Sequence, residues 1–177
     1  MNEHPRPPVI PDAARHDAFR GAMRSLAGAV SVITAGFGDE RSGLTATSVS
    51  SLSIDPPTLI ACINRNASTW PLIQRHRHFG VNVLAPHHEV VADRFAGRHG
   101  VKGAARYAGA DWLELVTGAP ILADAVVAID CELEEAIDRH SHSIVIGRVR
   151  AIHAGLGDAD AALIYWRGAY GAVTHHR

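Results

Sequence analysis

Residues 127–134, Val-Ala-Ile-Asp-Cys-Glu-Leu-Glu, place a larger apolar side chain at every second position and a small or charged one between. Because successive side chains of a β-strand point to opposite faces, this pattern predicts a strand with one buried and one wet face. Such strands are typical of antiparallel sheets. The stretch therefore indicates a mainly β fold.

Apolar segments on both sides of this strand predict the rest of the sheet. Val- and Ile-rich runs bounded by turn residues predict strands over 29–37, 58–63, 79–84, 144–152 and 163–173. Gly147 is expected to form a bulge. Helical spacing and caps predict helices over 16–26, 68–76 and 87–96. Since strands and helices do not alternate regularly, we predict an antiparallel barrel with a few peripheral helices.

The bulk composition is that of one soluble globular domain. The chain has 177 residues, 47% apolar and 20% charged, and a net charge of −1. This charge excludes a broad basic field, so neither nucleic acid nor a membrane surface is expected as a partner. We expect a flexible arm over 1–15 and the folded domain over 16–177. Two cysteines, Cys62 and Cys131, and the absence of a leader or long apolar run favour the reducing cytoplasm.

Several nucleotide-binding and catalytic motifs are absent from the sequence. It contains no G-x-G-x-x-G after a strand, no G-x-x-x-x-G-K-[ST], no C-x-x-C and no G-x-S-x-G. Any nucleotide must therefore be held by other means.

The segment Thr45–Ser51 contains three serines and two threonines. Small side chains allow backbone N–H groups to approach the edge of a flavin, and such donors stabilise the negative charge of the reduced ring. The same composition also suits a solvent-facing strand. Downstream, Ser68 and Thr69 at a helix start could bind a phosphate or simply cap the helix.

The whole series of motifs resembles the short-chain flavin reductases, which supply reduced flavin to two-component monooxygenases. The resemblance extends from about Phe19 to Tyr170. In chain order, the matching pieces are Phe19-Arg20-x-Ala22-Met23, Gly43-Leu44-Thr45-Ala46-Thr47-Ser48 with Ser50-Ser51, Asp55-Pro56-Pro57, Asn64 with Ser68-Thr69, Phe79-Gly80-Val81-Asn82-Val83-Leu84, Arg94-Phe95-Ala96-Gly97-Arg98, Gly118-Ala119-Pro120, His142 to Gly147 to Val149, and Tyr165-x-x-Gly168-x-Tyr170. It implies an FMN-binding split barrel of Greek-key type and a homodimer.

The resemblance also implies roles for matching residues. Thr45, Ala46, Thr47 and Ser48 are expected to line the isoalloxazine. Four hydroxyls are expected around the ribityl phosphate, those of Ser50, Ser51, Ser68 and Thr69. Cys62, Ile63 and Asn64 are expected beneath the phosphate. Phe95 and Arg98 are expected to flank the outer part of the cofactor. Tyr170, in the last matching motif, is also expected to contact the cofactor. His142 is expected to lie near the nicotinamide. Ser141 replaces the usual acidic or glycine neighbour of that histidine.

The implied function is an NAD(P)H-dependent reductase. Hydride passes from nicotinamide C4, on NADH or NADPH, to N5 of FMN or FAD, and no side chain need act as a nucleophile or strong base. The reduced flavin then goes to a partner monooxygenase. A non-enzymatic flavin-binding electron-transfer protein is the alternative, and a metal- or haem-binding barrel is a third. Histidine pairs at 76/78, 87/88 and 140/142 lack a recognisable four-ligand set, so no metal is expected.

Overall fold

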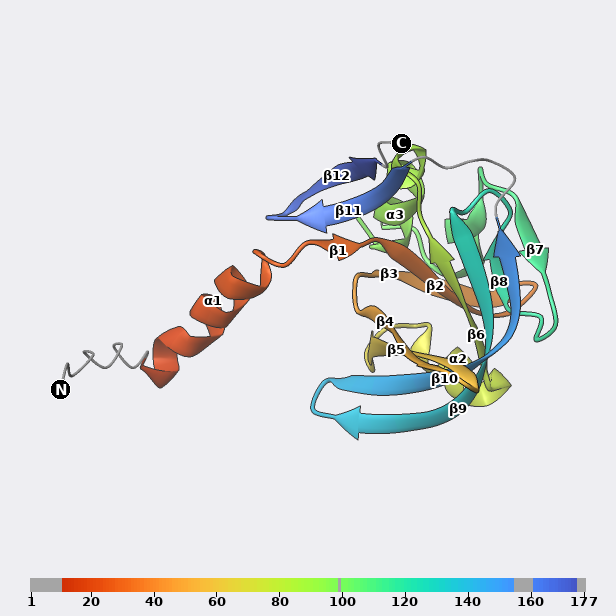
Figure 1. Cartoon of the computed structure of the whole chain (residues 1–177), viewed down its shortest axis with the longest axis horizontal. Coiled ribbons are helices and arrows are strands. Elements are labelled where there is room, and N and C mark those ends of the chain that lie inside the picture. Colours follow the sequence, from red (N-terminus) through yellow and green to blue (C-terminus); the bar gives the residue numbers. More distant parts are fainter. Residues whose placement is uncertain (1–10, 99, 155–160, 175–177) are drawn as a thin grey trace.

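A computed structural model describes residues 11–98, 100–154 and 161–174. Its centre is a seven-stranded antiparallel sheet with the strand order β3-β2-β6-β9-β10-β5-β4 (Figure 1). The strands of this sheet are β2 (Ser31–Phe37), β3 (Glu40–Ala46), β4 (Val49–Ile54), β5 (Pro57–Asn64), β6 (His78–Val83), β9 (Val127–Arg139) and β10 (His142–Ala154). The expected mainly β, antiparallel architecture is confirmed.

Two small sheets and a few short helices complete the fold. The sheets are β1 (Gly28–Ala29) with β11 (Ala161–Trp166) and β12 (Ala169–Thr174), and β7 (Trp112–Glu114) with β8 (Pro120–Leu122). The α-helices are α1 (Asp12–Met23), α2 (Trp70–His76) and α3 (Glu89–Phe95), and the 3-10 helices are η1 (Pro86–His88) and η2 (Gly103–Tyr107).

The two edge strands of the large sheet are consecutive in the chain. β3 and β4 lie at opposite ends of the strand order, yet only Thr47 and Ser48 join them. The N–H of Cys62 on β5 donates to the Ser48 carbonyl over 3.2 Å. The sheet must therefore roll until its edges meet at this link. Because β3 and β4 form no ladder with each other within the described residues, the barrel stays split there.

The core consists of two apolar clusters, one on each side of β2. Val32 belongs to the cluster that includes Phe95 and Tyr107, while Ile33 belongs to the one that includes Phe79. Since neighbouring side chains of a strand face opposite ways, β2 contributes to both clusters and is buried on both faces. Because β3 is hydrogen-bonded to this buried strand, the position of β3 is fixed by the packing of both clusters.

Several expected elements differ from those observed. The strand predicted over 163–173 is wrong, because the chain turns at Arg167-Gly168, both with positive φ, and forms the β11–β12 hairpin. α1 begins at Asp12, so the helix predicted over 16–26 starts and ends earlier. The arm predicted over 1–15 lies largely outside the described residues. The bulge expected at Gly147 is confirmed by a register shift between β10 and β9.

Helix α1 projects from the barrel (Figure 1). None of its residues, Asp12–Met23, is buried by the described part of the chain. The helix is attached where it meets the β11–β12 hairpin, since Trp166 Nε1 donates to the Ser25 carbonyl over 3.2 Å and Arg167 N to the Arg24 carbonyl over 2.9 Å. No helix among the described residues has the length and apolar character needed to cross a bilayer.

Candidate cofactor site

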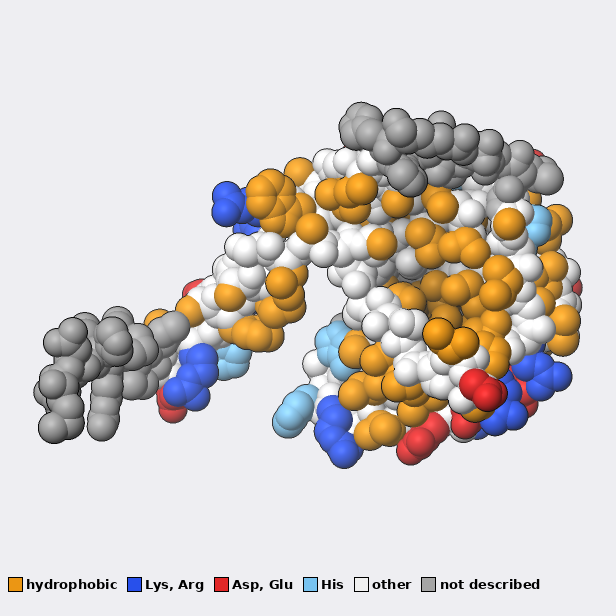
Figure 2. Space-filling model, viewed as in Figure 1, with side chains coloured by type: hydrophobic (Ala, Val, Ile, Leu, Met, Phe, Trp, Pro, Cys, Tyr) orange, Lys and Arg blue, Asp and Glu red, His pale blue; other side chains and the backbone are white. Residues whose placement is uncertain are grey.

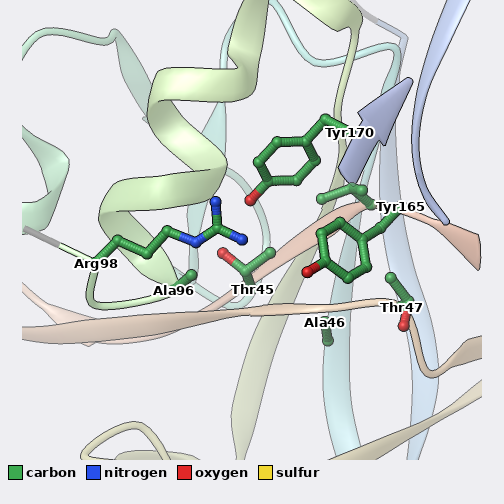
Figure 3. Close-up of a pocket in the computed structure, with 8 residues that line it drawn as sticks. Thr45, Ala46, Thr47, Ala96, Arg98, Tyr165 and Tyr170 are labelled. Carbon is green, nitrogen blue, oxygen red and sulfur yellow. The ribbon is translucent and has the colours of Figure 1, made fainter. Parts of the chain in front are cut away.

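A cavity of about 240 Å³ lies between β3, the end of α3 and the β11–β12 hairpin. Figure 3 shows the rings of Tyr165 and Tyr170 above β3, with Arg98 extending toward them from beyond the end of α3. The lining residues are Val30, Thr45, Ala46, Thr47, Ala96, Arg98, Tyr165 and Tyr170. The two tyrosine rings pack edge to face with centroids 5.3 Å apart. The cavity thus has aromatic walls and a floor of small side chains.

The one arginine of this cavity is already paired. Arg98 Nη1 lies 2.9 Å from Asp93 Oδ1, and its guanidinium carbon lies 5.3 Å from the centroid of the Tyr170 ring. Burial, with Asp93 as hydrogen-bond acceptor and nearby negative charge, raises the pKa of Tyr170 to about 12. The tyrosine is therefore neutral at pH 7. Since the ion pair cancels the arginine charge, the cavity suits an uncharged ring better than a phosphate.

Strand β3 is held firmly against α3 and η2 beneath the cavity. Thr45 Oγ1 donates to the Ala92 carbonyl over 2.6 Å, and the Tyr107 hydroxyl donates to the Ser42 carbonyl over 2.6 Å. Gly43 touches the Phe95 ring so closely that a Cβ there would lie 2.5 Å from Phe95 Cε1. This contact network preorganises the backbone of the predicted cofactor segment.

A second group of predicted residues gathers where β4, β5 and β10 meet. Ser48 Oγ donates to the Cys62 carbonyl over 3.0 Å. Asn64 on β5 is paired in register with His142 on β10. Ser141 Oγ lies 2.9 Å from His142 Nδ1. Because Ser48 directly follows Thr47, this group adjoins the cavity along the chain.

Ser68 and Thr69 lie on the other face of β3. Ser42 Oγ is 2.8 Å from Ser68 Oγ and 3.4 Å from Thr69 Oγ1, and Thr69 is fully buried. Ser42 and Thr45 are three residues apart on the strand and so point to opposite faces. The structure therefore brings Ser68 and Thr69 to Ser42 rather than to Thr45. The phosphate role expected of them stays a prediction.

Of the remaining predicted site residues, some are buried in the core and others are exposed on the surface. Ile63 and Phe95 belong to the core, with 0% and 2% of their surface exposed, so they can support the site only from beneath. Ser50 and Ser51 lie exposed on β4. Val30, Ala96 and Tyr165 line the cavity but were not predicted as site residues. The turn residues Arg167-Gly168 could have indicated the hairpin that brings Tyr165 to the cavity.

One histidine cluster has ligand atoms close enough for a metal ion. The ligand atoms of His87, His88 and Asp124 lie within 4.8 Å of one another. However, His88 Nδ1 accepts the N–H of Ala85 over 3.1 Å, so the ring proton of neutral His88 lies on Nε2. That nitrogen faces Asp124 Oδ1 at 3.1 Å. Neither ring nitrogen of His88 is then available to a metal, and the cluster is better described as a histidine–carboxylate pair.

An aromatic-walled cavity, set on a split antiparallel barrel and with its described arginine paired to Asp93, has the shape and lining that suit a flat ring system. The protein is thus of the class of barrels that bind a ring cofactor. Residues 23–174 match the family model described as the flavin reductase like domain. The chain belongs to this family.

Named relatives agree with this assignment. The chain is 45% identical over 156 residues to "FMN reductase (NADH) RutF 2" of Methylorubrum extorquens strain PA1, covering 86% of this chain and 87% of that protein. BorF, the flavin reductase component of a bacterial two-component tryptophan halogenase, superposes with a TM-score of 0.81 at 31% identity over 91% of this chain and 99% of its own. SgcE6 of Streptomyces globisporus C-1027, an NADH:FAD oxidoreductase in complex with NAD and FAD fragments, gives 0.80 at 25% identity over 93% and 96%.

Proposed function

We propose that this flavin reductase uses NADH to reduce FMN and passes the reduced flavin to a partner oxygenase. The aromatic-walled cavity over Thr45–Thr47, whose arginine is paired with Asp93, is the observation that supports this most directly. The identity of 45% to an NADH-dependent FMN reductase favours this nicotinamide and this flavin. A flavin carrier without turnover is the competing function on the same barrel.

The residues present fit a flavin. Tyr165 and Tyr170 offer apolar ring faces, and the backbone of Thr45–Thr47 offers polar groups at the edge of a ring. At about 240 Å³ the cavity is smaller than sites that enclose a whole drug-sized ligand, so it would hold the ring and leave the ribityl phosphate outside. We place that phosphate beside Ser50 and Ser51 of β4, which pair with Ile60 and Leu59 of β5.

When bound, the flavin supplies the N5 atom that accepts a hydride, and the chain supplies position. Thr45 and Gly43 hold the ring floor still through Ala92 and Phe95. The Thr47 hydroxyl and the N–H groups of Thr47 and Ser48 would favour a negatively charged reduced ring, since the Ser48 hydroxyl already donates to the Cys62 carbonyl. His142, at the adjoining group, is proposed to contact the nicotinamide. We therefore expect no residue to act as a nucleophile.

Steady-state NADH oxidation with added flavin tests this proposal. We expect turnover with free FMN, a higher kcat/KM with FMN than with FAD, and a higher value with NADH than with NADPH. NADPH oxidation is the matched control, because the two nicotinamides differ only by a phosphate remote from the hydride. Flavin binding without NADH oxidation at saturating flavin would support the carrier instead.

The proposal includes a homodimer in the cytoplasm. Helix α1 leaves Phe19 and Met23 exposed by 65% and 44%, and Leu26, just beyond it, is exposed by 64%. Figure 2 shows hydrophobic side chains along the projecting helix. A 12-residue helix without tertiary contacts is marginal in water, so this face needs a partner. A second copy is the best candidate, since each copy brings the same uncovered helix and a two-fold pair satisfies both. The free thiols of Cys62 and Cys131 favour a reducing compartment.

A further inference from the structure

Arg65, just after β5, contacts both residues of the β9–β10 turn and Asp138 near the end of β9. Its backbone N–H donates to the Ser141 carbonyl over 2.9 Å. Its Nη1 donates to the His140 carbonyl over 3.4 Å, and its Nη2 lies 3.3 Å from Asp138 Oδ2. Within the described residues, one arginine therefore reaches most of the turn that precedes His142.

The β9–β10 turn has a reason to need such support. Arg139 and His142 are paired, so His140 and Ser141 alone make the connection. His140 has a φ of 53°, in the left-handed region that a residue with a Cβ rarely adopts. A two-residue hairpin loop usually places glycine or asparagine at such a position. The contacts from Arg65 offset part of this backbone strain and hold the loop in one conformation.

The direction of His142 depends on this loop. Ser141, whose carbonyl accepts the backbone N–H of Arg65, also places its Oγ 2.9 Å from His142 Nδ1. Because any residue at position 65 keeps this backbone bond, the Arg65 side chain acts on the loop through the His140 carbonyl and Asp138. Asn64, the neighbour of Arg65, is the register partner of His142. A change in the path of the loop would therefore move the His142 imidazole, because it would alter both the contact with Ser141 and the pairing with Asn64.

We propose that Arg65 is a positioning residue that holds His142 in the direction needed to meet the nicotinamide. This inference rests on the proposed function, in which His142 contacts the hydride donor. Arg65 itself acts through the turn and need not touch either substrate.

The effect of Arg65 should be local. Its ion pair with Asp138 is partly exposed, at 43% and 47% of the two side chains, and exposed pairs contribute little to global stability. Loss of the side chain should therefore leave the barrel and the flavin cavity intact. It should mainly lower the fraction of molecules in which the loop directs His142 toward the nicotinamide.

Arg65→Ala tests the inference by NADH oxidation kinetics. We expect the KM for NADH to rise by about fivefold or more, the flavin Kd from fluorescence quenching to stay within about twofold, and Tm to change little. Arg65→Lys keeps the charge but loses the planar fork, so it should restore part of the KM. In a His142→Ala background, Arg65→Ala should add no further increase, because its route of action has been removed.

Arg75→Ala is the matched control. It removes another exposed arginine, which pairs with Glu40 at 3.0 Å, remote from this turn, and should leave KM unchanged. An unchanged KM in Arg65→Ala, or additive effects in the double variant, would overturn the inference.

A second readout does not depend on turnover. The imidazole NMR signals of His142, assigned by their loss in His142→Ala, should shift in Arg65→Ala and not in Arg75→Ala. Unshifted signals would refute the positioning role. Shifted signals in a protein that fails to oxidise NADH would refute only the proposed function.

Discussion

Gly43 lets β3 lie directly on the Phe95 ring. A Cβ at this position would lie 2.5 Å from Phe95 Cε1 and 2.8 Å from the Ile33 carbonyl oxygen, and the backbone atom cannot rotate away. Gly43→Ala should therefore overpack the core and destabilise the protein by about 1–3 kcal/mol. It should also raise the flavin Kd, because the displaced strand forms the cavity floor. Urea unfolding and fluorescence quenching measure the two effects.

Gly21→Ala is the control for this substitution. Gly21 lies in α1, and a Cβ added there would have nothing within 4 Å, so alanine should be neutral or slightly stabilising. Equal stability losses in both variants would contradict the proposed contact with Phe95.

Tyr170 separates the ring contribution from the hydroxyl contribution. Its ring packs on Tyr165 and against the Arg98 guanidinium, while burial and the nearby Asp93 carboxylate raise the pKa of its hydroxyl. Tyr170→Ala should raise the flavin Kd by about tenfold, since an aromatic wall is lost. Tyr170→Phe should change it by less than about threefold, because the ring is kept. Flavin titration of both variants checks this, and equal losses would show that the hydroxyl carries the affinity.

Sequence patterns identified the polar floor of the cavity but not all of its walls. Thr45, Ala46 and Thr47 were predicted from their composition and from the family resemblance, and they line the cavity. Tyr165 and Val30 were not predicted, because only the pairing of β1 with β11 brings them beside β3. Ser68 was expected at the ribityl phosphate, and its hydroxyl lies 2.8 Å from that of Ser42 on the opposite face of β3, so its role stays a prediction.

At the scale of elements, α1 is a helix whose apolar face has no partner within the described residues. Phe19→Glu with Met23→Glu should shift the protein to monomer, because two charges would be buried in the proposed interface. Sedimentation velocity at micromolar concentration measures the change. Ala14→Glu with Gly21→Glu places the same charges on the other side of the helix and should leave the assembly intact. Dimers in both double variants would exclude α1 from the interface.

Element positions were more predictable than element ends. The alternation over 127–134 predicted the first part of β9, which starts at Val127 and continues to Arg139 beyond the alternating part. The hairpin of β11 and β12 was predicted as one strand, because apolar residues flank Arg167-Gly168 on both sides and the turn at these two residues was overlooked. Local patterns locate strands, whereas their ends depend on partners distant in sequence.

At the scale of the whole molecule, two buried histidines make stability depend on pH. Burial lowers the pKa of His78 against the opposing effects of the Thr117 carbonyl and Asp130, with His76 lowering it further. Burial likewise lowers the pKa of His88 against Asp124. The folded state therefore binds protons less readily than the unfolded chain. This stabilisation is complete above about pH 6.5 and is lost as the pH falls through the folded-state values.

Thermal unfolding between pH 8 and pH 5 checks this dependence. Tm should fall below about pH 6.5. His78→Gln with His88→Gln should lower Tm at pH 8 but flatten its fall toward pH 5, since the groups that titrate are gone. His87→Gln, at a 64% exposed side chain, should retain the slope of the parent. If the Tm of the double variant fell with pH as steeply as that of the parent protein, groups other than His78 and His88 would cause the pH dependence.

The strand content and the split barrel were predictable, but its strand order was not. Apolar alternation marks each strand separately and carries no information on its neighbours. The order β3-β2-β6-β9-β10-β5-β4 follows from long-range pairing, in which β6 joins β2 to β9. The resemblance to a family indicated the type of barrel in advance, but no strand order was predicted from it.

Only two residues link β3 and β4, so a flavin bound across this link would hold the two edges of the sheet together. A ligand that contacts Thr47 on one edge and Ser50 on the other stabilises the closed barrel by about 2.7 kcal/mol at a hundred times its Kd. Opening fluctuations at both edges should then become rarer, and amide hydrogen exchange in β3 and β4 should slow together on flavin addition. Protection of β3 alone would place the ligand on one edge only. A reductase that has just released its product is, on this view, also the form most easily opened by a protease.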